Sequence, residues 1–123
     1  MTSKKRRGTV IYENPQGILL TRTGHHPWLL PGGHAERNEP RIITAIRELA
    51  EETTLRATEV KYLFDFESTY FFHKVYLIRA EGNPIPASEI TALTWYQPEN
   101  IELIKSINKS SLEIINLYMS NRP

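Results

Sequence analysis

The stretch that decides the fold covers residues 33–55 and reads GHAERNEPRIITAIRELAEETTL. Its second half predicts a helix. Asn38 or Glu39 can cap the start, and Pro40 suits a first turn, where its missing N–H costs nothing. No glycine or proline interrupts the run that follows, so we expect the helix to continue to Thr53.

This helix has an apolar face and a carboxylate face. At about 100° per residue, one arc carries Ile42, Ala45, Ile46, Leu49 and Thr53, and an opposite arc carries Glu48, Glu51 and Glu52. Carboxylates at this spacing repel each other by about 0.2–0.5 kcal/mol per pair. A hard divalent cation such as Mg²⁺ offsets that repulsion, because it prefers carboxylate oxygens and completes its shell with water and phosphate. The alternative is that these carboxylates form an acidic face exposed to solvent and bind no metal ion.

The spacing on both sides of the helix resembles the signature of the Nudix hydrolases, G-x5-E-x7-R-E-U-x-E-E-x-G-U, in which U is aliphatic. The residues that fill it are Gly33, Glu39, Arg47, Glu48, Leu49, Glu51, Glu52 and Leu55. Only Thr54 departs, since it stands where the family has glycine. A left-handed threonine costs about 1–2 kcal/mol. Either Thr54 accepts that strain or the helix ends differently, and neither outcome removes a metal ligand.

The resemblance implies an α/β fold of the Nudix type, an α/β/α sandwich with a mixed β-sheet between helices. Strands before and after the central helix, with further helical sequence at the end of the chain, indicate the same architecture. We expect residues 8–123 to form this single domain and residues 1–7 to form a basic N-terminal tail. We expect this tail to be exposed to solvent. The alternative is that its positive charge contributes to the attraction of phosphate groups.

The activity that the resemblance implies is Mg²⁺-dependent hydrolysis of a phosphoanhydride bond in a nucleoside diphosphate-linked substrate, with Mn²⁺ as a possible substitute. The short chain favours a nucleoside triphosphate pyrophosphohydrolase of the MutT type. ADP-ribose, dinucleoside polyphosphates, capped RNA ends and nucleotide sugars stay open as substrates. A non-catalytic Nudix-fold module that binds nucleotides is a further alternative, although all four signature glutamates are present.

The resemblance also implies roles for individual residues. The expected metal ligands are Glu48, Glu51 and Glu52, together with the backbone carbonyl of Gly33 or its neighbour Gly32. Arg47 joins the catalytic set because it can pair with Glu51 four residues later. The general base is expected to be Glu52, within the signature, or Glu89, in the loop before a strand at residues 92–97.

Two further residues are candidates for substrate contact. Arg22 ends a predicted strand, where MutT-like enzymes often hold a basic residue near the nucleotide; an exposed strand-end charge is equally compatible. His34 directly follows the glycines and could contact a phosphate or base, or lie free in an exposed loop. A zinc site formed with His25 and His26 is rejected, because adjacent side chains on an extended segment point to opposite faces.

Composition narrows the remaining possibilities. The 123-residue chain has no cysteine, which excludes disulfides, thiolate zinc sites and a cysteine nucleophile. It also argues against the isopentenyl diphosphate isomerase branch of the superfamily, whose chemistry needs a cysteine. No apolar run approaches the roughly 20 residues of a membrane span, and no signal peptide is visible. We therefore expect a cytoplasmic protein. A net charge of +1 predicts no stable nucleic-acid partner, and the oligomeric state is not indicated.

Other segments predict strands and a second helical region. A hairpin is expected around the turn at residues 14–17, and alternation places Val60, Tyr62, Phe64 and Phe66 on one face of a strand. A longer strand follows from residue 70. Its aromatic residues are core candidates first, although Tyr70 or Phe72 could stack on a base. Helical sequence begins after Pro98 and should dock on the sheet through its apolar stripe.

Overall fold

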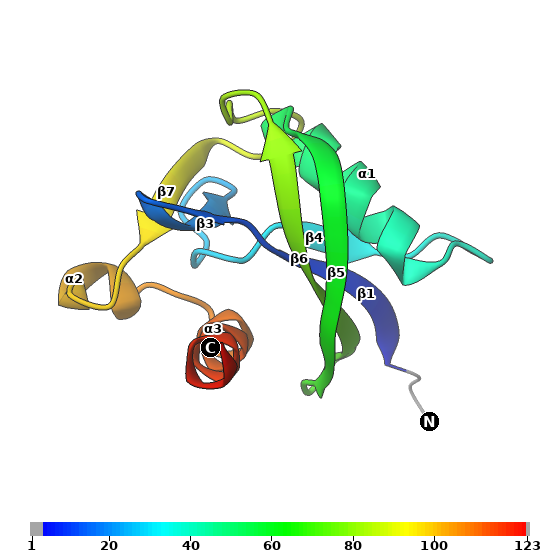
Figure 1. Ribbon diagram of the computed structural model, residues 1–123. Helices are drawn as coiled ribbons and strands as arrows, with labels where there is room; N and C mark the ends of the chain where they lie inside the picture. Colours follow the sequence, from blue (N-terminus) through cyan, green and yellow to red (C-terminus); the bar gives the residue numbers. More distant parts are fainter. Residues whose placement is uncertain (1–3, 123) are drawn as a thin grey trace.

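The computed structural model describes residues 4–122, which form seven strands and three helices (Figure 1). Along the chain these are β1 (Lys5–Ile11), β2 (Glu13–Asn14), β3 (Gly17–Arg22), β4 (Gly32–His34), α1 (Arg41–Thr53), β5 (Arg56–Glu67), β6 (Phe71–Glu81), β7 (Ala92–Tyr96), α2 (Ile101–Ile104) and α3 (Lys109–Asn121).

The strands divide into two sheets rather than one. Four strands form a mixed sheet in the order β4-β1-β6-β5, in which β1 and β6 run parallel and the other pairs antiparallel. The strands β2, β3 and β7 form a smaller antiparallel sheet. Helices α1 and α3 lie on opposite sides of the mixed sheet (Figure 1). The expected α/β/α class with a mixed sheet is confirmed.

Two apolar cores follow from the alternation of side chains across the mixed sheet. Val10 and Ile11 are adjacent in β1 and fully buried, but Val10 packs toward α1 and Ile11 toward α3. Gly8 lets α1 approach this strand closely, because a Cβ there would lie 2.6 Å from the carbonyl oxygen of Arg41. β1 therefore contributes to both cores and is buried on both faces.

A β-bulge overturns the expected alternation in β5. The pairing with β6 shifts between Tyr62 and Phe64, so that Leu63 is the extra residue. One inserted residue moves every later side chain to the other face. Val60 accordingly packs in the α1 core, whereas Phe64 and Phe66 pack in the α3 core.

The N-terminal segment differs from the sequence expectation in two ways. β1 pairs with β4 and β6, and only β2, with Tyr12 before it, forms the hairpin with β3. In addition, β1 begins at Lys5, so residues 5–7 belong to the sheet and not to a tail. Residues 1–3 of that expected tail lie outside the described residues.

The ends of α1 also differ from the expected caps. The N-cap is Pro40, which makes no side-chain cap hydrogen bond, rather than Asn38 or Glu39. Thr54 takes the left-handed conformation (φ 63°, ψ 2°), and its N–H donates to the carbonyl of Ala50 at 2.9 Å. The threonine thus accepts the strain that glycine avoids.

The C-terminal helix docks on the sheet as expected. Its buried positions are Ser111, Ile114, Ile115 and Tyr118, whereas Leu117 is 41% exposed. Within residues 4–122, no helix has the length and apolar character needed to cross a membrane.

Candidate active site

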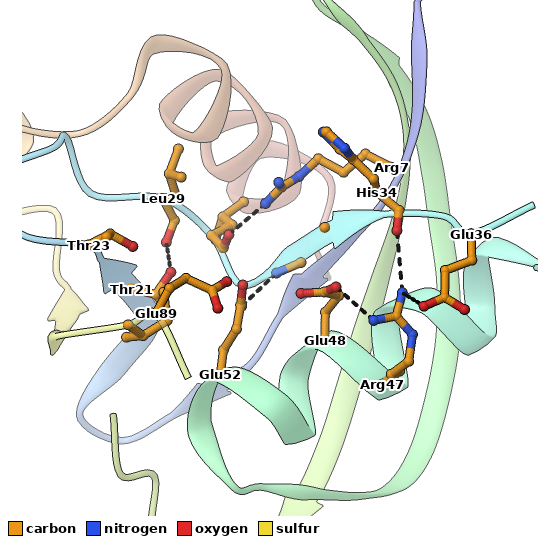
Figure 2. Close-up of a pocket in the computed structure, with 14 residues that line it drawn as sticks. Arg7, Thr21, Thr23, Leu29, His34, Glu36, Arg47, Glu48, Glu52 and Glu89 are labelled. Carbon is orange, nitrogen blue, oxygen red and sulfur yellow. Dashed lines mark hydrogen bonds and ion pairs between the residues drawn. The ribbon is translucent and has the colours of Figure 1, made fainter. Parts of the chain in front are cut away.

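Three carboxylates meet at one end of α1. Glu48 and Glu52 come from the helix and Glu89 from the loop between β6 and β7, and one oxygen of each lies within 4.8 Å of the others (Figure 2). They line a pocket of about 390 Å³. Residues four apart on a helix point in directions only about 40° apart, which explains why Glu48 and Glu52 share it.

The loop that carries Glu89 is tied to the last turn of α1. The N–H of Ile85 donates to the carbonyl of Thr53 at 2.9 Å, and the N–H of Ala87 donates to that of Glu52 at 3.0 Å. These bonds satisfy carbonyls that a helix end leaves unpaired. They also bring Glu89, which is distant in sequence, to the carboxylates of the helix.

The surroundings shift the pKa values of the three carboxyl groups in different directions. Burial, together with the neighbouring Glu48 and Glu89, raises the pKa of Glu52 to about 8 against the opposing effects of the Gly32 N–H and Arg7. Burial also raises the pKa of Glu48, against the opposing effect of Arg47. The Ser88 hydroxyl lowers the pKa of the more exposed Glu89. Burial therefore disfavours ionisation of Glu52 and Glu48, and Glu89 is the most readily ionised group of the three.

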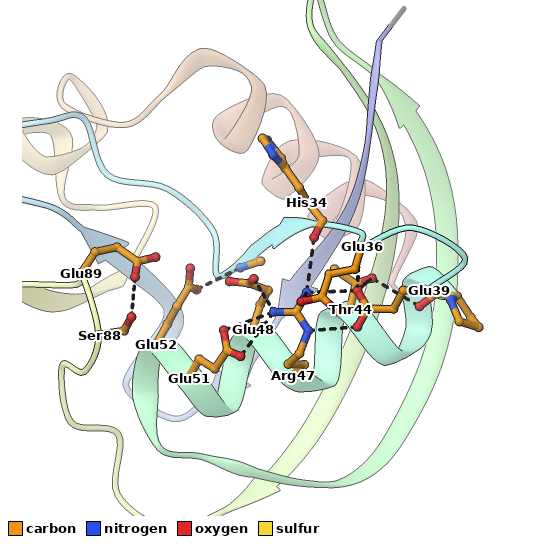
Figure 3. A network of polar contacts seen from close by, with 12 residues as sticks. His34, Glu36, Glu39, Thr44, Arg47, Glu48, Glu51, Glu52, Ser88 and Glu89 are labelled. Carbon is orange, nitrogen blue, oxygen red and sulfur yellow. Dashed lines mark hydrogen bonds and ion pairs between the residues drawn. The ribbon is translucent and has the colours of Figure 1, made fainter.

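Glu51 does not join this cluster. Its direction on the helix is about 60° from Glu48 and 100° from Glu52, and its side chain is 50% exposed. Arg47 Nη1 contacts both of its oxygens, at 3.2 and 3.3 Å (Figure 3). The structure therefore separates Glu51 from the other two helical carboxylates with which the sequence grouped it.

Arg47 is the hub of a hydrogen-bond network beside the pocket (Figure 3). Besides Glu51, its guanidinium donates to both oxygens of Glu39, to Glu48 Oε1 at 2.9 Å and to the carbonyl of His34. Glu39 also accepts from the Glu36 N–H and the Thr44 hydroxyl. Arg47 and these two donors lower the pKa of Glu39 to about 2. The pair that the sequence predicted between Arg47 and Glu51 is one of these contacts.

The short strand β4 closes one side of the pocket. The N–H of Gly32 donates to Glu52 Oε1 at 3.1 Å. A Cβ at Gly33 would lie 2.5 Å from the carboxyl carbon of Glu48, so a side chain there would displace this carboxylate. The backbone at Gly33 is thus next to Glu48, and its role as a metal ligand stays a prediction.

Arg7 is the pocket residue that the sequence did not single out. Its Nη2 donates to the carbonyl of Leu30 at 3.0 Å and its Nε to the Thr9 hydroxyl at 3.2 Å. It lines the same pocket as the three carboxylates (Figure 2). The only signal in the sequence was the run of basic residues 4–7, and alternation along β1 turns Arg7, but not the exposed Arg6, toward the pocket.

The two expected substrate-binding residues lie in different places. His34 lines the carboxylate pocket, with its ring 5.2 Å from that of Phe71. Arg22 does end β3, but its guanidinium lies over the Trp28 ring at 4.4 Å and faces a separate surface pocket. The structure therefore brings His34, but not Arg22, to the carboxylates.

The donor set fits a hard divalent cation. Three carboxylate oxygens converge, burial and mutual repulsion disfavour the ionised forms of Glu48 and Glu52, and a bound cation would reverse that penalty. Neither cysteine nor histidine is part of the cluster, so the donors are all of the hard oxygen type.

Comparison with known proteins agrees with this fold. The model of the NUDIX domain matches residues 3–118. A crystal structure from Chromobacterium violaceum, assigned to the Nudix hydrolase family, superposes with a TM-score of 0.90 at 35% identity and covers 99% of this chain and 82% of the other. The chain belongs to the Nudix family.

More distant structures share the fold. MutT from Aliivibrio salmonicida and Vibrio cholerae matches with a TM-score of 0.66 at 23% identity, over 77% of this chain and 81% of the other. A bifunctional NMN adenylyltransferase/ADP-ribose pyrophosphatase from Francisella tularensis, in complex with AMP and a manganese ion, matches with a TM-score of 0.76 at 22% identity. That match covers 98% of this chain and 42% of the larger one.

Proposed function

We propose that this Nudix protein hydrolyses a phosphoanhydride bond in a nucleoside triphosphate and releases pyrophosphate, as a MutT-type pyrophosphohydrolase. The observation that carries the proposal is the convergence of Glu48, Glu52 and Glu89 in one pocket with Arg7 on its wall. Anionic phosphates need cations around them, and this pocket offers one fixed guanidinium and a set of carboxylates suited to a metal ion.

Glu48 and Glu52 are the residues that would hold Mg²⁺, or Mn²⁺ in its place, and Glu89 lies beside them. When bound, a divalent cation would neutralise phosphate charge and lower the pKa of a bound water. The other ligands predicted from the sequence, Glu51 and the Gly33 carbonyl, stay predictions, and the Glu51 carboxylate is bonded to Arg47. Arg7 would bind a phosphate oxygen of the substrate and stabilise the charge that spreads over it during the reaction.

We assign the general base to Glu89 in preference to Glu52. A base must be ionised when the reaction begins. Glu89 is exposed and the Ser88 hydroxyl lowers its pKa, whereas Glu52 is buried and would be engaged by the cation. Glu89 would accept the proton of the attacking water at the open side of the pocket. Arg47 would orient the carboxylates to which it donates hydrogen bonds and would not contact the substrate.

A substrate panel tests the proposal. The purified protein would be incubated with Mg²⁺ and, separately, with each common nucleoside and deoxynucleoside triphosphate, ADP-ribose, a dinucleoside polyphosphate and a capped RNA. We expect metal-dependent formation of a nucleoside monophosphate and pyrophosphate from a triphosphate, and loss of that activity in Glu52→Gln. Turnover confined to ADP-ribose or a capped RNA would overturn the MutT assignment. Nucleotide binding without any turnover would instead define a non-catalytic module.

A further inference from the structure

A basic cleft of about 310 Å³ lies beside the carboxylate pocket, at the start of β1. The residues that line it are Lys4, Lys5, Arg6 and residues 34–37. Two of them, His34 and Glu36, also line the carboxylate pocket. Glu36 lies on the side of Glu48 away from Glu89 (Figure 2). The basic cleft therefore continues the carboxylate pocket at the end opposite Glu89.

Positive charge predominates in the basic cleft. The charged residues that line it are four bases and one acid: Lys4, Lys5, Arg6, Arg37 and Glu36. Lys4 is paired with Glu67, but Lys5 and Arg6 form no ion pair with a carboxylate of the described residues. The side chain of Glu36 is 71% exposed, so water and salt screen its charge. The basic run at residues 4–7 of the sequence thus contributes to a surface that attracts anions.

The two walls of the basic cleft are fixed relative to each other. Arg7 pairs with His34 across the sheet, and the N–H of Ala35 donates to the carbonyl of Arg6 at 2.9 Å. The Arg6 side chain is also held, because its Nη2 donates to the carbonyl of Glu39 at 3.1 Å. Its Nε and Nη1 have no acceptor among the described residues. A guanidinium with a set position and free N–H groups is a suitable donor to phosphate oxygens.

His34 connects the basic cleft to Arg7 in the carboxylate pocket. Lys5 and Arg7 share one face of β1 by alternation, and burial together with these two charges lowers the pKa of His34. The imidazole is therefore neutral at pH 7 and can donate a hydrogen bond without adding charge. An anionic chain that extends from the carboxylate pocket past His34 comes next to the Lys5 ammonium.

The size and lining of the basic cleft favour a phosphate chain over a nucleic acid. Its volume is roughly ten times the share of one water molecule in the liquid, which suits a small anion. None of the described residues that line it is Phe, Tyr or Trp. Sites for single-stranded nucleic acids combine basic residues with aromatic rings on which the bases stack. A short phosphate chain needs only the basic residues.

We propose that Lys5 and Arg6 bind the terminal phosphates of the substrate, and that the basic cleft thereby selects chains of three or more phosphates over diphosphates. This inference rests on the proposed function, because it assumes that the reacting phosphates lie in the carboxylate pocket. The phosphate chain then runs from the carboxylates past His34 into the cleft. A diphosphate-linked substrate such as ADP-ribose has both phosphates at the scissile bond and none left to reach the cleft.

The first experiment measures binding without catalysis. Phosphate, pyrophosphate and tripolyphosphate would be titrated into the wild-type protein and Lys5→Gln/Arg6→Gln in EDTA at low ionic strength. We expect tripolyphosphate to bind most tightly. The double variant should weaken it by about 2- to 30-fold, which corresponds to about 0.4–2 kcal/mol for two exposed charge pairs. Failure of tripolyphosphate to bind the wild-type protein at millimolar concentration overturns the inference.

The matched control is Lys61→Gln/Arg79→Gln. It removes the same two residue types from exposed positions on β5 and β6, outside the basic cleft. Tripolyphosphate should bind this control as it binds the wild-type protein, and equal losses in the two double variants would show that only net charge matters.

A charge-conserving variant separates loss of charge from loss of structure. Lys5→Arg/Arg6→Lys keeps both positive charges and should bind tripolyphosphate nearly as the wild-type protein does. A loss as large as that of Lys5→Gln/Arg6→Gln would overturn the electrostatic role. A single-stranded deoxyhexanucleotide without a terminal phosphate is titrated in parallel. If it binds more tightly than tripolyphosphate, with the same dependence on Lys5 and Arg6, the cleft is a nucleic-acid site and the phosphate-chain assignment is overturned.

A kinetic readout separates this inference from the proposed function. With Mg²⁺ and a hydrolysed nucleoside triphosphate, Lys5→Gln/Arg6→Gln should lower kcat/KM by the factor found for tripolyphosphate binding, mainly through KM. The difference should shrink as salt is added, because exposed charges are screened. Triphosphate hydrolysis with equal kcat/KM in the wild-type protein and this variant overturns the inference while the proposed activity stands. Tripolyphosphate binding that depends on Lys5 and Arg6, without hydrolysis of any nucleotide, supports the cleft while the proposed activity fails.

Discussion

The carboxylate of Glu39 accepts two parallel hydrogen bonds from Arg47, one from Nε at 2.9 Å and one from Nη2 at 3.0 Å. The third nitrogen of the same guanidinium donates to Glu48 and Glu51. This one side chain therefore couples the loop before α1 to the carboxylates of the pocket. The arrangement needs the planar fork of arginine, which lysine lacks.

We expect Arg47→Lys to lower both stability and turnover, because lysine cannot bond Glu39 through two nitrogens and still reach Glu48. Hydrogen bonds to charged groups contribute about 1–3 kcal/mol, so the free energy of unfolding should fall by that order. Urea titration and steady-state kinetics measure the two effects. Arg37→Lys, at an exposed position of the preceding loop, is the control and should change neither. Wild-type stability and kcat in Arg47→Lys would contradict the role as a hub.

Glu51 and Glu52 are adjacent but should differ in their effect on catalysis. Glu52→Gln removes a charge from the cluster, and we expect kcat to fall by about 100-fold or more, because metal-assisted stabilisation supplies several kcal/mol and about 1.4 kcal/mol is a factor of ten. Glu51→Gln should cost at least about tenfold less, since Glu51 lies outside the cluster. Equal losses in the two variants would restore Glu51 to the ligand set.

The same Glu52 variant is expected to be more stable than the wild type at alkaline pH without metal. Burial raises the pKa of Glu52 from about 4.5 to about 8 in the folded protein. Its contribution to stability is therefore full below pH 4.5 and is lost as the pH rises through 8. Thermal unfolding at pH 8.5 in EDTA should show a higher midpoint for Glu52→Gln. A lower midpoint would mean that the carboxylate is structural.

Glu89→Gln tests the general base. Loss of a base costs about 100- to 10,000-fold in rate, and we expect this loss in kcat with little change in KM, since the proton transfer belongs to the transition state. Glu102→Gln, in the exposed first turn of α2, is the control. If kcat in Glu89→Gln equals that of the wild type, the role returns to Glu52.

Thr54→Gly should stabilise the protein by up to about 1 kcal/mol, because Thr54 is held at φ 63° and glycine takes that conformation without steric cost. Thr54→Ala keeps a Cβ at the same angle and should give no comparable gain. Urea unfolding of the three proteins measures the difference. A loss of stability in Thr54→Gly would show that contacts of the threonine side chain outweigh its backbone strain.

We expect the buried His73 to make the stability of the protein depend on pH under acidic conditions. Burial lowers its pKa from 6.5 to about 4 in the folded state, so its contribution to stability is full above pH 6.5 and is lost as the pH falls through 4. The loss can reach about 3 kcal/mol. His73→Gln should remove this part of the pH dependence between pH 7 and pH 4, as measured by urea unfolding, whereas the exposed His25→Gln should not. An unchanged slope in His73→Gln would contradict the prediction.

The local features of the site could be predicted from residues 33–55 alone. The extent of α1 and the shared face of Glu48 and Glu52 depend on helical geometry, which acts over a few residues, whereas the conformation of Thr54 was left open by the sequence. For the same reason the spacing of eight matching residues was enough to indicate the Nudix family, which the domain match confirms.

Other features depend on residues that are far apart in the chain. The Leu63 bulge, the division into two sheets and the place of β1 in the centre of one of them follow from pairing between distant strands, and local alternation does not encode such pairing. Glu89 reaches the site only because its loop bonds to the end of α1.

The sequence by itself determined the helix, its carboxylates and the family, because those are set by short-range spacing. Only the tertiary structure decided which partners each carboxylate meets. It joined Glu89 to Glu48 and Glu52 and left Glu51 with Arg47, and it turned Arg7 into the pocket. The distances, burial and electrostatics of the site depend on segments that folding brings together. They are therefore set only once the strands and loops have packed.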